Sequence, residues 1–141
     1  KKSSKPVDRI DFKRSVTSAY FNNTGDKLLT TNMNDTLSVI PMLKAGFAPP
    51  SAHTNIRHDN QTGRWLTTFH AIWHPKTDMI AVGSMKQPRG VDLFDATGKS
   101  PEQRVTWDVI TAVPTRLAFH ESGDILVGGN ASGRVVVMDN R

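Results

Sequence analysis

Short apolar runs separated by turn-forming residues recur along the chain. The runs LLTT, MIAVGS and ILVGG have the length of buried strands. Glycine tolerates a positive φ and aspartate bonds to its own backbone, so pairs of these residues favour tight turns. The turn pairs are Gly25-Asp26 and Gly123-Asp124 before the runs, and Asn34-Asp35 and Ser132-Gly133 after them. The last two lead into the further strands TLSVI and RVVVM. The pattern predicts an all-β chain in which groups of three strands are joined by tight turns.

This pattern repeats three times. Each repeat has an aromatic residue followed five positions later by an aspartate, and the aromatic residues are 52 and then 46 positions apart. The pairs are Phe21 with Asp26, Trp73 with Asp78, and Phe119 with Asp124. We therefore expect three consecutive antiparallel strands in residues 15–42, 65–95 and 112–139, with the aromatic residues buried at equivalent places. The three aspartates should lie in turns on the face opposite Arg64.

The connecting segments HTNIRH and QRVTW are expected to supply a fourth strand for the first two units. Four short strands per unit, recurring at this interval, are typical of β-propeller blades. Three similar β-units could also belong to a sandwich or a β-solenoid. Three blades do not close a ring, so the sequence is expected to be the last part of a larger propeller. We divide it into a basic connector or tail at 1–14 and three repeats at about 15–58, 59–107 and 108–141.

The repeat is similar to that of the WD40 family, whose third strand closes on a tryptophan-aspartate pair. That place holds Ile40-Pro41, Phe94-Asp95 and Met138-Asp139, so the resemblance rests on whole-repeat spacing. The blocks RHDNQTGRWLTTFHAIWHPK, VGSMKQPRGVDLFDATGK and VGGNASGRVVVM resemble the WD40 propellers related to damage-specific DNA-binding protein 2. This resemblance implies the carboxy-terminal blades of a nuclear, seven-bladed propeller that binds DNA and chromatin-associated proteins and acts in the DNA-damage response.

The same resemblance implies a link to cullin-4 ubiquitin ligases through the adaptor damage-specific DNA-binding protein 1. In such proteins an Asp and Arg motif that docks the adaptor follows the third strand of a blade. Only Asp139 to Arg141 approaches this motif here. Adaptor docking is therefore expected on a blade upstream of residue 1.

The segment TGRW is the most specific part of the resemblance. WD40 geometry implies that its loop shares one face with the loops NMND, SMKQPR and NASGR. Arg64, Lys86 and Arg89, with Arg134 as a further candidate, would then meet on one rim that neutralises phosphates. In the damage-binding relative, a hairpin at the TGRW position inserts side chains into the minor groove at a lesion. The predicted DNA-binding residues are Gly63, Arg64, Trp65, Lys86 and Arg89.

Most of these residues also have a structural alternative. On DNA, Trp65 would be the wedge between bases, Arg64 would bind a phosphate, and Gly63 would let the backbone come close. Alternatively, Trp65 is the first buried residue of the inner strand, because large aromatic residues at strand starts are usually core. Arg64 and Lys86, taken singly, are most often solvated surface charges. Their joint placement on one rim favours the functional interpretation.

Net charge adds little to this picture. The formal net charge is +5, from 18 Lys and Arg and 13 Asp and Glu, but six of these cations lie in the first fourteen residues against two aspartates. The remaining 12 basic and 11 acidic residues nearly cancel, so any further basic surface must be a local cluster. Lys1, Lys2 and Lys5 are interpreted as a disordered linker or as a nuclear-targeting or DNA-contacting arm. There is no cysteine, and no apolar run approaches the roughly 18 residues of a membrane span.

No catalytic constellation stands out, and we expect neither an enzyme nor a cofactor or metal site. The sequence has no Ser-His-Asp grouping, phosphate-binding glycine loop or paired carboxylates in a suitable pattern. His70 and His74 on one strand would lie about 13 Å apart, which is too far for one ion. Three functions stay open: a DNA- and chromatin-binding scaffold, a protein-only interaction platform on the same rim, and a ubiquitin-ligase substrate receptor.

Overall fold

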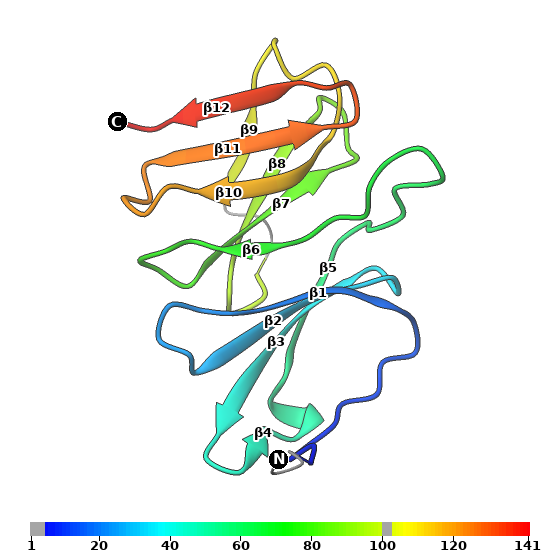
Figure 1. The fold of residues 1–141 in the computed structure, drawn as a ribbon, viewed down its shortest axis with the longest axis vertical. Coiled ribbons are helices and arrows are strands. Elements are labelled where there is room, and N and C mark those ends of the chain that lie inside the picture. Colours follow the sequence, from blue (N-terminus) through cyan, green and yellow to red (C-terminus); the bar gives the residue numbers. More distant parts are fainter. Residues whose placement is uncertain (1–4, 100–102) are drawn as a thin grey trace.

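Residues 5–99 and 103–141 are described by a computed structural model, in which antiparallel strands form three successive sheets (Figure 1). The first sheet contains β1 (Val16–Phe21), β2 (Lys27–Asn32), β3 (Thr36–Leu43), β4 (Gly46–Phe47) and β5 (Thr54–Arg57), with β4 and β5 both paired to β3. The second contains β6 (Ile72–Trp73), β7 (Met79–Ser84), β8 (Gly90–Asp95) and β9 (Gln103–Thr106). The third contains β10 (Pro114–Phe119), β11 (Ile125–Asn130) and β12 (Val135–Asp139). Apart from a 3-10 turn at Pro50–Ala52, the described residues contain no helix, and the all-β prediction is confirmed.

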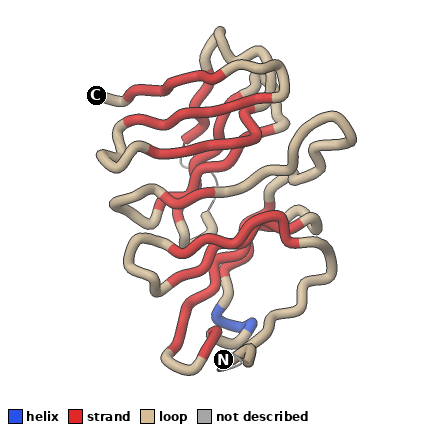
Figure 2. The backbone as a smooth tube through the Cα atoms, viewed as in Figure 1, coloured by secondary structure: helices blue, strands red, loops and turns tan. Residues whose placement is uncertain are grey.

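Three consecutive antiparallel strands lie in each predicted segment, and Figure 2 shows them as successive groups of red tubes. The predicted fourth strands are β5 and β9. The strand register places the repeated positions opposite one another in the same way in every sheet. The aligned sets are Phe21, Leu28 and Ile40; Trp73, Ile80 and Phe94; and Phe119, Leu126 and Met138. The sequence repeat is therefore a repeat of strand arrangement.

Two apolar clusters hold neighbouring sheets together. The cluster between the first and second sheets includes Leu29, Leu37, Phe69, Trp73, Ile80 and Phe94. The cluster between the second and third sheets includes Ala81, Val91, Leu93, Leu126 and Met138. Because both clusters lie between sheets, each sheet depends on its neighbour for burial of its apolar face.

The prediction that all three repeat aromatics are buried is wrong for Phe21. Trp73 is 8% exposed and packs against the first sheet, and the half-buried Phe119 packs in the same way against the second sheet. Each of these rings is therefore covered by the preceding sheet. Phe21 lies in the first sheet, and its side chain is 58% exposed because no preceding sheet covers it in the described residues.

The inner strand of the second sheet is shorter than residues 65–95 led us to expect. Only Ile72 and Trp73 pair with β7. The backbone just before them bonds to side chains of the first sheet instead: Thr31 Oγ1 accepts from the N–H of Ala71 at 2.9 Å, and Thr17 Oγ1 donates to the carbonyl of Phe69 at 2.8 Å. The segment before Ile72 is thus a connection fixed between two sheets.

The loops gather at two opposite ends of the sheets (Figure 1). The turn face, on the left, consists of the β1–β2, β6–β7 and β10–β11 turns, residues 22–26, 74–78 and 120–124. The connection face, on the right, consists of residues 33–35, 58–71, 85–89 and 131–134, with 107–113 following the end of β9. Asp26, Asp78 and Asp124 lie on the turn face, opposite Arg64, as predicted.

The basic start of the chain is only partly described. Lys1 and Lys2 lie outside the described residues, and Lys5 is exposed. Further along, Oδ2 of Asp8 accepts a hydrogen bond from the N–H of Phe47 at 2.8 Å, so this segment is attached to β4. Within the described ranges, no helix is both long and apolar enough to cross a membrane.

Candidate nucleic-acid interface

The connection between β5 and β6, residues 58–71, carries the TGRW block and extends from the sheets at the right of Figure 2. Its first half is anchored on the β2–β3 loop through Asn60, which is 1% exposed. The Asn60 amide donates to the carbonyls of Asn32 and Thr36 at 2.8 and 3.2 Å, and its N–H donates to Oδ1 of Asp35 at 3.0 Å. The base of the connection therefore has a fixed position.

The tip of this connection projects between two anchored segments. Gly63 has φ +73°, a left-handed conformation that favours glycine in a tight turn. Trp65 is 87% exposed, whereas the adjacent Leu66 packs against the cluster between the first and second sheets. Phe69 then enters the core. Because both flanks are held, the fold of the loop itself presents the indole to solvent.

The interpretation of Trp65 as the first buried residue of the inner strand is therefore wrong. The inner strand begins at Ile72, and the intervening residues form a turn and an irregular segment. Arg64 is exposed beside Trp65. Contacts of Gly63, Arg64 and Trp65 with DNA stay predictions.

Besides Arg64, the cations on or beside the connection face include the following four: Arg57, Lys86, Arg89 and Arg134. Arg57 ends β5, Lys86 and Arg89 lie in the β7–β8 connection, and Arg134 lies in the β11–β12 turn. All are exposed except Arg89, which is half-buried. In the part of the chain that the structure describes, neither these four residues nor Arg64 forms an ion pair. Their charges are therefore available to a ligand.

A cavity of about 260 Å³ lies between the first and second sheets, beside the base of the TGRW connection. We call it the His58–Asp92 pocket; it is lined by Arg57, His58, Asp59, Ser84, Met85, Lys86, Asp92 and Phe94. Arg57, Asp59 and Lys86 are exposed and form its mouth. The pocket thus opens on the same face as the TGRW loop.

Charged and polar groups form the inner end of this pocket. The side chains of His58 and Asp92 are 4% and 2% exposed, and His58 Nε2 lies 3.8 Å from Asp92 Oδ2. Nε of Arg104 donates to Asp92 Oδ1 at 2.6 Å, and His58 Nδ1 lies 2.7 Å from Asn60 Oδ1. Burial lowers the pKa of His58, against the opposing effects of the Asn60 hydrogen bond and the Asp92 charge. The lowered pKa favours the neutral imidazole. No group of three or more histidines and carboxylates in the described ranges could hold a metal ion.

The chain is similar in sequence to WD repeat proteins and to DNA damage-binding proteins. No family model matches the chain. It is 38% identical to WD repeat-containing protein 76 of Xenopus laevis over 97% of the chain and 24% of that protein, and 37% identical to that of Mus musculus over 93% and 21%. It is 37% identical to DNA damage-binding protein CMR1 of Cryptococcus neoformans over 86% of the chain and 23% of that protein. The three sheets are WD40-type propeller blades. The chain spans about a quarter of the length of the curated relatives it matches.

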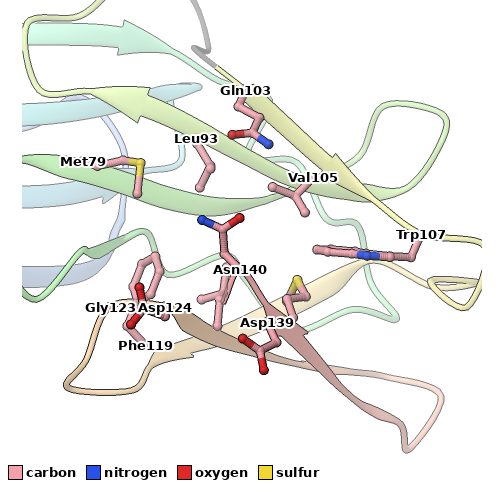
Figure 3. Close-up of a pocket in the computed structure, with 12 residues that line it drawn as sticks. Met79, Leu93, Gln103, Val105, Trp107, Phe119, Gly123, Asp124, Asp139 and Asn140 are labelled. Atoms are coloured by element: carbon pink, nitrogen blue, oxygen red, sulfur yellow. The ribbon is translucent and has the colours of Figure 1, made fainter.

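A second cavity, of about 340 Å³, lies between the second and third blades (Figure 3). Its lining includes apolar side chains from both blades, among them Met79, Leu93, Val105 and Phe119. Trp107 lies at its edge, between the blades, and is 38% exposed. The charged residues in its lining, Asp124 and Asp139, are acidic and would repel phosphates. This cavity is therefore unsuited to DNA.

The Asp and Arg motif at the end of the third blade forms an internal ion pair. Nη2 of Arg141 lies 2.5 Å from Oδ2 of Asp139. Hydrogen bonds from Arg141 lower the pKa of Asp139 to about 2. The two side chains therefore bind each other, and adaptor docking stays a prediction for another blade.

No sequence pattern indicated the His58–Asp92 pocket. His58 and Asp92 belong to different blades. Each lies in a block that carries the WD40 resemblance, but no local pattern links the two residues. The signal for Arg57 was available, since it ends a predicted strand directly before the TGRW connection. The meeting of His58 with Asp92 depends on how two blades pack, which one sequence does not reveal.

Proposed function

We propose that the connection face of these blades binds DNA and chromatin, and that the protein acts in the nucleus in the response to DNA damage. The exposed Trp65 at the tip of an anchored loop is the observation that carries this proposal. Tryptophan is highly buried on average, so its presentation to solvent on a fixed loop favours a binding role. The names of the CMR1 relatives, DNA damage-binding proteins, support the same function.

The side chains of this face would contact different parts of DNA. Arg64, Lys86 and Arg89, joined by Arg57, would neutralise phosphates, which gives salt-dependent affinity without sequence preference. Trp65 would enter a base step as an apolar wedge, a cost of a few kcal/mol that stacking of about 1–3 kcal/mol and added phosphate contacts offset. Gly63 would let the backbone approach the duplex. With these separate roles, we expect the strongest binding to DNA whose base stack already opens easily.

We further propose that the repeats at about 15–58, 59–107 and 108–141 are the carboxy-terminal blades of a seven-bladed propeller. Chromatin-associated proteins are its expected partners. A contact with damage-specific DNA-binding protein 1 and a cullin-4 ligase would use a blade outside this sequence. WD40 repeat proteins are typically scaffolds without enzymatic activity, and we propose no reaction for this one.

The test is DNA affinity of the full polypeptide and of Trp65→Ala, measured on an intact duplex and on a mismatched duplex of the same sequence. The variant should lose more affinity for the mismatched duplex than for the intact one, because only there does the wedge enter at low cost. Trp65→Phe is the control and should keep most of the preference. Equal losses on both duplexes would remove the wedge role. Absence of DNA binding by the wild type would favour the protein-only platform.

A further inference from the structure

The inner end of the His58–Asp92 pocket contains two hydrogen-bond acceptors that face each other. The Asn60 amide nitrogen donates to two backbone carbonyls, so Asn60 Oδ1 is the acceptor in its contact with His58. His58 Nδ1 must then carry the proton, and Nε2 of the neutral ring is an acceptor. The group 3.8 Å away, Oδ2 of Asp92, is an acceptor too. Neither atom carries a hydrogen that it could donate to the other, so the two atoms cannot form a hydrogen bond with each other.

A donor from a ligand would satisfy both atoms. Among the hydrogen bonds that the structure describes, none ends on His58 Nε2 or on Asp92 Oδ2, although both side chains are more than nine-tenths buried. A nitrogen placed about 2.9 Å from each atom could donate to both. The pocket, at about 260 Å³, is far larger than the roughly 10–15 Å³ that a single water needs. It therefore has room for a group bigger than water.

The surroundings decide what kind of nitrogen fits. Arg104 already compensates the charge of Asp92 at 2.6 Å, so a neutral donor is sufficient. At the mouth, Arg57 and Lys86 outnumber Asp59, so the net positive charge there would disfavour an ammonium or guanidinium group and attract a phosphate. Met85 and Phe94 supply apolar surface for a ring. A ligand with a neutral amino group, an aromatic ring and a phosphate matches all three parts.

We propose that the His58–Asp92 pocket takes a nucleobase with an exocyclic amino group, which donates to His58 Nε2 and Asp92 Oδ2. The proposal rests on the proposed DNA-binding function when the base comes from a strand held on the connection face. A free nucleotide would present the same chemistry. Cytosine, adenine and guanine carry an exocyclic amino group, and thymine lacks it.

The primary test compares two ligands that differ only in that group. Affinity of the full polypeptide is measured for two duplexes of one sequence, with a single bulged nucleotide that carries either cytosine or 2-pyrimidinone, which is cytosine without its amino group. We expect the cytosine bulge to bind about tenfold tighter, since only its amino group can donate to His58 Nε2 and Asp92 Oδ2. This comparison uses the wild-type protein and needs no variant.

A pair of matched variants assigns the preference to the pocket. Met85→Trp should fill the pocket and abolish the preference for cytosine without removing any of its hydrogen bonds. Met42→Trp makes the same change at another half-buried methionine, whose N–H bonds to the Asp26 carbonyl on the turn face, and should keep the preference. Thermal melts of both variants, recorded first, identify any loss of folding.

Competition with free deoxycytidine monophosphate distinguishes the two sources of the base. Competition by the free nucleotide, but not by the 2-pyrimidinone nucleotide, means that the pocket takes free ligand; a preference seen only in the duplex means that the strand delivers the base. Equal affinity for the two bulges, or a preference that survives Met85→Trp in a folded protein, would overturn the pocket proposal and leave DNA binding standing. No binding of any duplex would overturn the proposed function itself.

Discussion

The turn face and the connection face of these blades use their polar residues in opposite ways. On the turn face, Lys27 bonds Asp78 of the next blade at 2.8 Å and lies 3.5 Å from Asp26. Asn22 donates to both aspartates as well, at 2.7 and 3.2 Å. Hydrogen bonds from Thr24 and Asn22 lower the pKa of Asp26 to about 2. These charges are committed to joining two blades.

The connection face keeps its hydrogen bonds at the base of its loops and leaves its cations at their tips. Asn60 and Asp35 fix the TGRW connection, while Arg64 and Lys86 form no ion pair within the described ranges. Trp65 stands exposed beside Arg64. One end of the blades is therefore stabilised by its charged groups, and the other end presents its cations to solvent.

The largest expected difference between the faces is the loss of stability when a tryptophan of each is replaced by alanine. Trp73 lies in the core beside the turn face, and its Nε1–H donates to the Tyr20 carbonyl at 2.9 Å. Trp73→Ala should cost about 3–5 kcal/mol, because it opens a cavity between blades. Trp65→Ala should change the free energy of unfolding by no more than about 0.5 kcal/mol. Urea unfolding of both variants gives the measurement, and a large loss for Trp65→Ala would make it a core residue after all.

Two buried asparagines should separate stability from binding. Asn22→Ala and Asn60→Ala each remove several hydrogen bonds and should each cost about 1–3 kcal/mol in urea unfolding. Only Asn60→Ala releases the TGRW connection, so only this variant should also weaken DNA binding while folded. Equal DNA affinity of the two folded variants would contradict the role of the anchored loop.

The faces should also differ in their response to pH. Burial lowers the pKa of His58 below about 6.5, so its contribution to stability is full above that pH and is lost as the pH falls. The pKa of Asp26 is lowered to about 2, so the contribution of Asp26 to stability is lost only between about pH 3.8 and 2. Between pH 7.5 and 5.5, His58→Gln should therefore show a smaller fall in unfolding free energy than the wild type. Burial also lowers the pKa of His70, so the variant His70→Gln measures how much of the pH dependence comes from that histidine.

Local signals in the sequence were sufficient for most of the fold. Gly25 and Gly123 have φ +73° and +83° and lie in the turns that their pairing with aspartate predicted. Phe21 was placed wrongly because its exposure depends on a neighbouring blade, not on its own strand. The burial of Trp65 could not be decided from sequence, because the strand that would have buried it is replaced by bonds to Thr17 and Thr31. The His58–Asp92 contact depends on interblade packing and has no local signal.

The central claim, that the connection face binds DNA and the turn face does not, is tested most directly by salt dependence. Duplex affinity is measured across a salt series for the wild type, Arg64→Ala and Lys76→Ala, which removes an exposed cation from the turn face. Loss of one phosphate contact should reduce the slope of log affinity against log salt by about 1 for Arg64→Ala. The slope for Lys76→Ala should equal that of the wild type. An unchanged slope for Arg64→Ala, or a reduced slope for Lys76→Ala, would contradict this account.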